Sequence, residues 1–121
     1  MESLLNRAKG PWVIADAGAL LSAFWQDLPP DSAARLQAAS QLIEACVAAS
    51  PYLRGLMLAD PDFAAQAVHS IPEELFTTLC SQLEKEVSIT DAEEAARLLR
   101  QGKARAALLL ALADVGGVWT V

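Results

Sequence analysis

Six prolines divide the first part of this 121-residue chain, and none follows Pro72. Because proline lacks a backbone N–H and clashes with the preceding turn, it ends a helix in progress but fits the first position of a new one. Ser50-Pro51 and Asp60-Pro61 each place a capping side chain directly before such a proline. The sequence therefore predicts about five helical segments joined by short connections, with the longest near the C-terminus.

Apolar residues between these breaks repeat at three- and four-residue spacing, which is the spacing of one helical face. The first predicted helix covers Asp16 to Leu28 and ends at Pro29-Pro30, and Asp31 caps a second that runs through Val47. Two short helices are predicted next, at about Pro51 to Ala59 and Pro61 to His69.

Two capping boxes begin the later helices. Ser70 with Glu73 predicts a helix whose apolar positions, from Leu75 to Val87, share one face, and this face includes Cys80. Thr90 with Glu93 predicts a last helix that runs to Asp114, with Gly116-Gly117 as its stop.

The last predicted helix changes character at its middle. Its first half is amphipathic, whereas Ala106 to Ala113 is apolar on every side and needs to be enclosed. Five short helices can enclose it only in part, and the apolar end Val118-Trp119-Thr120-Val121 adds to the exposed surface. Two interpretations stay open: Trp119 folds back on the bundle, or the helix and this end self-associate or meet further helices after Thr120.

The composition favours a single all-α subdomain over residues 1–121, folded as an irregular bundle. Alanine and leucine outnumber β-branched residues, and 54% apolar with 20% charged residues is enough for a core. A net charge of −6 argues against nucleic-acid binding. Because the chain shows neither a secretory signal nor an apolar run long enough to cross a membrane, we expect a cytoplasmic protein.

Few residues of this chain could take part in a reaction or bind a metal ion. Cys46 and Cys80 have no metal-ligand spacing, and we expect both to be buried, reduced thiols. His69 is the only histidine, and a contact with carbonyls at a helix end is a better prediction for it than catalysis. Asp60 fits the N-cap of the helix that begins at Pro61, and Asp62 fits an acidic residue in the first turn of that helix. We therefore predict no catalytic, cofactor-binding or metal-binding residue in this chain.

One basic patch stands out in an acidic chain, formed by Arg97, Arg100, Lys103 and Arg105. One interpretation is a solvated helix face paired with Glu93 and Glu94. The other is an interaction surface for an acidic partner or a phosphate, to which the end of the chain at Trp119 would also contribute.

Two blocks of the sequence resemble a known family. Residues 50–61, SPYLRGLMLADP, and residues 98–119, from LLRQGK to ALLLALADVGGVW, resemble the N-terminal region of bacterial glutamine synthetase adenylyltransferase, most of all its alphaproteobacterial branch. The order and separation of the two blocks fit as well. They are helix-packing signatures and contain none of the family's catalytic residues.

The resemblance implies that this chain is a fragment of a large bifunctional enzyme that attaches AMP from ATP to a tyrosine of glutamine synthetase and removes it by phosphorolysis. It implies a downstream nucleotidyltransferase domain with Mg²⁺ or Mn²⁺, together with glutamine synthetase and the PII signalling protein as partners. The fragment itself would be inactive and would act as a scaffold or interaction subdomain. The alternative is a self-contained helical interaction module with no enzymatic parent.

Overall fold

The computed structural model describes residues 2–10 and 17–118, and this part of the chain is all-α, as predicted. It contains eight helices and no strand, where about five helices were expected. The longest helix lies near the C-terminus, which confirms that prediction. The helices are α1 (Leu4–Arg7), α2 (Gly18–Asp27), α3 (Pro30–Gln37), α4 (Ser40–Ala49), α5 (Pro51–Ala59), α6 (Pro61–His69), α7 (Pro72–Ser88) and α8 (Ala92–Val115).

The segments placed individually along the sequence number six, and two differences raise this number to eight. The short helix α1 was not predicted, and the predicted second helix is divided into α3 and α4 by a turn at Ala38 and Ala39. This turn lets the two halves pack on different neighbours, since α3 contacts α6 whereas α4 contacts α2, α5 and α8. Leu36 and Ile43 are thereby both fully buried. The predicted start of the first helix at Asp16 lies outside the described residues.

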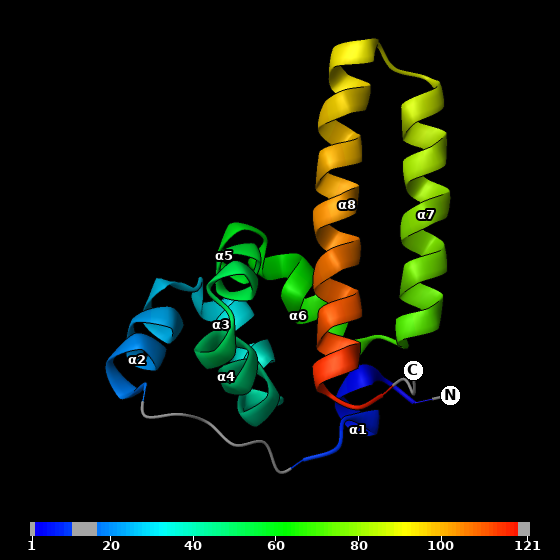
Figure 1. Ribbon diagram of the computed structural model, residues 1–121. Helices are drawn as coiled ribbons and strands as arrows, with labels where there is room; N and C mark the ends of the chain where they lie inside the picture. The colour runs from blue at the N-terminus through cyan, green and yellow to red at the C-terminus, as the bar shows by residue number, and fades with distance from the viewer. Residues whose placement is uncertain (1, 11–16, 119–121) are drawn as a thin grey trace.

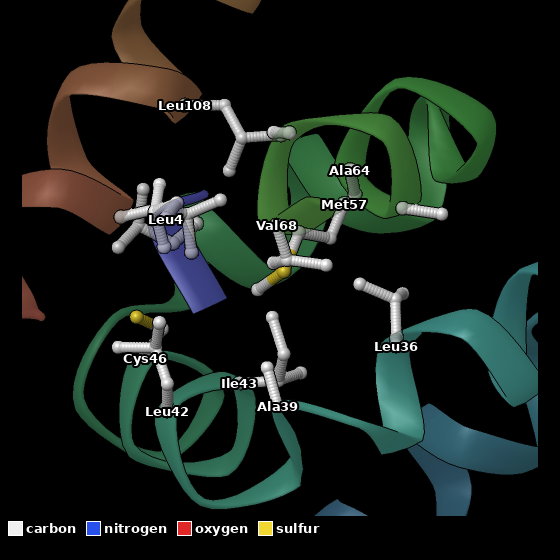
Figure 2. Packing of buried hydrophobic residues seen from close by; sticks show 14 of the residues in the cluster. Leu4, Leu36, Ala39, Leu42, Ile43, Cys46, Met57, Ala64, Val68 and Leu108 are labelled. Atoms are coloured by element: carbon white, nitrogen blue, oxygen red, sulfur yellow. The ribbon is translucent and has the colours of Figure 1, made fainter. Parts of the chain in front are cut away.

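Helix α6 is at the centre of the core and contacts α1, α3, α5 and α8. Its buried residues include Ala64 and Val68, and in Figure 2 these lie among Met57 of α5, Ile43 of α4 and Leu36 of α3. The small alanine side chains of α6 allow its neighbours to approach closely. The core is thus built from short helices that each contribute one apolar face.

Helices α7 and α8 form an antiparallel hairpin (Figure 1). The C-terminal half of α8 packs on α4, α5 and α6, and the distal half of the hairpin stands clear of the other helices. The apolar face predicted for α7 is present, but it is only partly covered because α8 is its main neighbour. Cys80 is therefore exposed, so the prediction that both thiols are buried was wrong for Cys80 and is confirmed for Cys46.

Three predicted caps are wrong in detail. Asp91 caps α8, because its carboxylate accepts a hydrogen bond from the N–H of Glu94 at 2.8 Å, one residue after the predicted cap Thr90. Helix α7 begins after Ile71, and the Ser70 hydroxyl donates to the Gln66 carbonyl at 2.6 Å. Asp31 lies inside the first turn of α3. In each case proline or a competing carboxylate decides where the helix begins.

Two other helix ends are as predicted. The Ser50 hydroxyl accepts a hydrogen bond from the N–H of Leu53 at 3.2 Å and caps α5. The stop at Gly116-Gly117 is also confirmed, since α8 ends at Val115 and Gly117 has a φ of 67°. In that left-handed conformation a glycine avoids the strain that a Cβ would add.

The apolar half of α8 is enclosed on one side only. Leu108, Leu109, Leu112 and Ala113 are buried, whereas Leu110 is 44% exposed. The expectation that the short helices enclose this segment only in part is therefore confirmed for the described part of the chain, and an apolar surface remains on its outer face. The predicted roles of Trp119, Thr120 and Val121 lie outside the described residues.

Candidate functional site

The structure divides the predicted basic patch between opposite sides of α8. Arg105 turns towards the core, whereas Arg97, Arg100 and Lys103 are exposed. This follows from helix geometry. Arg105 comes two residues after Lys103 and five residues after Arg100, and residues at these spacings lie on different faces of a helix. Trp119, the other residue predicted for this surface, lies outside the described residues.

Arg105 links α8 to the junction of α5 and α6. Its Nε donates to Oδ2 of Asp60 at 2.7 Å, and its guanidinium lies 5.2 Å from the centre of the Phe63 ring. Both charged side chains are about one-third exposed, so the pair is only partly screened by solvent. Asp60 occupies the position before α6, but its side chain makes no capping hydrogen bond there, which corrects the predicted cap.

A pocket of about 220 Å³ adjoins this ion pair. Leu56, Phe63 and Leu108 give it an apolar wall, and Gln101 and Arg105 contribute polar groups. The strongest donor in the pocket is already bound to Asp60, so the arrangement stabilises the packing of α8 on α5 and α6 and leaves little capacity for a ligand.

The exposed residue Arg97 is paired within its own helix. Its guanidinium binds the carboxylate of Glu94, with 2.9 Å between Nε and Oε2. The side-chain hydrogen bond from Arg97 lowers the pKa of Glu94, and the same bond raises the pKa of Arg97. The predicted pairing with an acid of the same helix is thus present for Glu94. Arg100 and Lys103 form no ion pair with any residue that the structure describes.

Three polar contacts that sequence reasoning missed also join helices. Arg7 Nη1 and Nη2 donate to Oε1 and Oε2 of Glu73, at 2.5 and 2.9 Å, and this pair connects α1 with α7. The buried Ser32 hydroxyl donates to Asp62 at 3.0 Å and connects α3 with α6. His69 Nε2 donates to the Arg35 carbonyl at 2.9 Å, so it contacts the end of α3 and not the end of its own helix. No local pattern predicts such distant partners.

The described residues contain no group of three or more His, Cys, Asp or Glu side chains that could hold a metal ion. The residues present therefore do not fit the Mg²⁺ or Mn²⁺ that the family resemblance implies, which prefers several carboxylate or phosphate oxygens. None of the described helices is both long enough and apolar enough to span a membrane.

The chain is similar to curated proteins of one kind. It is 44% identical over 73 residues to the bifunctional glutamine synthetase adenylyltransferase/adenylyl-removing enzyme of Bradyrhizobium sp. strain BTAi1, covering 60% of this chain and 7% of that protein. The enzyme of the same name from Rhodopseudomonas palustris strain TIE-1 is 39% identical over 80 residues, or 65% of this chain and 8% of that protein.

A third relative extends the similarity almost to the whole chain. The enzyme of the same name from Rhodopseudomonas palustris strain BisB5 is 33% identical over 124 aligned residues, covering 94% of this chain and 12% of that protein. The chain thus spans about a tenth of the length of the curated relatives it matches. No protein-family profile and no solved structure matches it. The resemblance seen in the sequence is confirmed, and the chain belongs, through a match to a small part of its members, to the family of bifunctional glutamine synthetase adenylyltransferase/adenylyl-removing enzymes of alphaproteobacteria.

Proposed function

We propose that this chain is a helical scaffold subdomain of an enzyme that adds AMP to, and removes it from, glutamine synthetase. One observation carries the proposal: the related segment is a compact body of short helices from which the α7–α8 hairpin extends. The C-terminal half of α8 is fixed in the core, and its N-terminal half forms a rigid arm with α7. Such an arm can hold a neighbouring domain at a defined distance and orientation.

The polar contacts support a scaffold role. Arg105 with Asp60, Arg7 with Glu73, and Ser32 with Asp62 each join two helices. These pairs satisfy the side chains that could otherwise serve a reaction. The first two also fix the hairpin on the body, whereas Ser32 with Asp62 joins two helices within the body. Arg97, Arg100 and Lys103 remain the candidate interaction surface, whereas Arg105 acts inside the fold.

In this proposal the chemistry belongs to a downstream nucleotidyltransferase domain of the parent enzyme. That domain would bind ATP and Mg²⁺ or Mn²⁺, and the parent would act in the cytoplasm on glutamine synthetase under control of the PII signalling protein. The metal would orient the phosphates and stabilise charge on the transferred group. The chain described here would bind neither nucleotide nor metal and would be inactive alone.

The alternative is a self-contained helical interaction module without an enzymatic parent. The length of the natural reading frame distinguishes the two. Continuation beyond Val121 into a Gly-Ser motif followed by paired aspartates supports the enzyme, and a stop codon soon after Val121 supports the module.

A chimera tests the scaffold role directly. The matching segment of the Rhodopseudomonas palustris strain BisB5 enzyme is replaced by this chain, or is deleted as the control, and transfer of labelled AMP to glutamine synthetase is measured. We expect the chimera to retain transfer, the deletion to lose it, and the chain alone to show none. Full activity of the deleted enzyme, or AMP transfer by the chain alone, would contradict the proposal.

A further inference from the structure

Residues 3–9 lie across the base of the α7–α8 hairpin, where α7 begins and α8 ends (Figure 1). The Leu4 N–H donates a hydrogen bond to the Ser70 carbonyl at 2.8 Å, just before α7. The Lys9 N–H donates to the Gly116 carbonyl at 2.8 Å, just after α8. One short segment therefore bridges the two ends of the hairpin, which are far apart along the chain. We call residues 3–9 the clasp.

The clasp is anchored in the core near its start. Leu4 has no exposed surface, and its side chain is part of the buried cluster that Figure 2 shows. The Ser3 hydroxyl accepts a hydrogen bond from the Asn6 N–H at 3.4 Å and caps α1. Because α1 packs mainly on α6, the clasp belongs to the body of short helices and not to the hairpin.

The second half of the clasp contacts both helices of the hairpin. Arg7 donates to both carboxylate oxygens of Glu73, in the first turn of α7, and the Arg7 side chain is 21% exposed. A bidentate pair of this kind fixes orientation as well as distance. Ala8 lies close to Gly116, since a Cβ on Gly116 would come within 3.4 Å of the Ala8 Cβ. Arg7 therefore holds α7, and Ala8 with Lys9 holds the end of α8.

Helix α7 has little other attachment to the body. Its buried residues are Pro72 and Leu75, both in its first turn, and α8 is its main neighbour. Helix α8, by contrast, is fixed in the core through residues such as Leu109 and Leu112. The contacts at the root of α7 therefore decide the direction in which α7 leaves the body.

We propose that the clasp sets the direction of α7, and that release of Arg7 from Glu73 lets the root of α7 move away from α8 while the core stays folded. The two parts of the clasp have separate roles in this device. Leu4 keeps α1 in the core, whereas the ion pair lies near the surface and opens without exposing the core. The inference does not rest on the proposed enzymatic role, because the position of α7 is measured in the chain alone.

Electron paramagnetic resonance distances between two spin labels test the clasp. One label is placed on Cys80, which is exposed on α7, and the other on Ala34→Cys, on the exposed side of α3; Cys46 is buried. We expect one narrow distance distribution for the otherwise unchanged chain. Arg7→Glu places like charges together and should broaden and shift this distribution. Arg7→Glu combined with Glu73→Arg rebuilds the pair and should restore it.

The matched control is Arg97→Glu, which reverses one charge of the ion pair with Glu94 inside α8. It should leave the distance distribution unchanged, because that pair does not connect the hairpin with the body. Arg7→Ala removes the clasp ion pair without adding repulsion and should broaden the distribution less than Arg7→Glu, so the test remains available where the charge reversal prevents folding. An unchanged distribution in both Arg7 variants, or equal broadening by Arg97→Glu, would overturn the proposal.

Hydrogen exchange separates opening of the clasp from general unfolding. The Leu75 N–H bonds to the Ile71 carbonyl at 2.9 Å in the first turn of α7, and the Ile43 N–H bonds to the Ala39 carbonyl at 3.0 Å in the core. Arg7→Ala should accelerate exchange at Leu75 by about fivefold and leave Ile43 unchanged. Equal acceleration at both amides would mean that Arg7 stabilises the whole fold and is not a clasp for α7.

Discussion

Gly102 of α8 lies directly against Leu83 of α7, and a Cβ on Gly102 would come within 2.7 Å of Leu83 Cδ2. The absence of a side chain thus allows the two helices to approach closely at the middle of the hairpin. This contact accounts for a glycine inside the longest helix, where glycine otherwise costs about 1 kcal/mol relative to alanine.

Gly102→Ala should therefore fail to stabilise the chain, since the gain in helix propensity is offset by displacement of Leu83. Gly55 is the matched control, because it lies inside α5 with nothing within 4 Å of a Cβ built on it. Gly55→Ala should raise the free energy of unfolding by about 0.5–1 kcal/mol. Denaturant unfolding of both variants measures the difference, and equal stabilisation would contradict the close contact.

Substitutions at the start of α8 identify its cap. Asp91→Ala should lower the free energy of unfolding by about 1 kcal/mol, because the Glu94 N–H loses its acceptor. Thr90→Ala removes the side chain that the sequence pattern favoured and should change stability much less. Thermal unfolding of the two variants decides, and a larger effect of Thr90→Ala would show that the cap is Thr90.

Leucines on the two sides of α8 should respond differently to truncation. Leu109→Ala or Leu112→Ala should cost about 2–5 kcal/mol, since both side chains are fully buried and truncation leaves a cavity. Leu110→Ala should cost less than about 1 kcal/mol in the monomer, because Leu110 is already partly in water. Urea unfolding at low protein concentration tests this. A large loss for Leu110→Ala would mean that its face is covered in the monomer.

The ion pair between Asp60 and Arg105 should stabilise the docking of α8. A double-mutant cycle with Asp60→Ala and Arg105→Ala should give a coupling energy of about 1 kcal/mol, since both groups are partly buried and hydrogen-bonded. The same cycle on Glu94 and Arg97 is the control and should give a smaller coupling, because that pair is exposed to solvent. A smaller coupling energy for Asp60 and Arg105 than for Glu94 and Arg97 would show that Arg105 stabilises the fold through its contact with Phe63 alone.

Burial of Cys46 should make stability depend on alkaline pH. Burial raises the pKa of the Cys46 thiol from 9.0 to about 11, so the folded chain keeps a proton that the unfolded chain loses. The free energy of unfolding should thus fall by up to roughly 2–3 kcal/mol as pH rises from about 9 to about 11. A Cys46→Ala variant, measured by the same denaturant titrations, should show a shallower decrease. Equal slopes would mean that Cys46 ionises freely in the fold.

The prolines and the apolar spacing determined the helical class and most helix positions. Pro51, Pro61 and Pro72 begin helices in the structure because each one prevents the preceding helix from continuing. These effects act within a few residues along the chain, so the sequence alone contains them. The glycines after Val115 end α8 for the same kind of local reason.

Only the tertiary structure decided which side chains meet. By sequence, Asp60 fits the N-cap of α6. In the structure its carboxylate instead accepts a hydrogen bond from Arg105 of α8 and makes no capping hydrogen bond. The second predicted helix breaks at Ala39 because its two halves bury their apolar faces against different neighbours. Likewise, only packing shows that the apolar half of α8 has one covered side and one open side. These outcomes depend on contacts between residues far apart in the chain, which local propensity and spacing do not record.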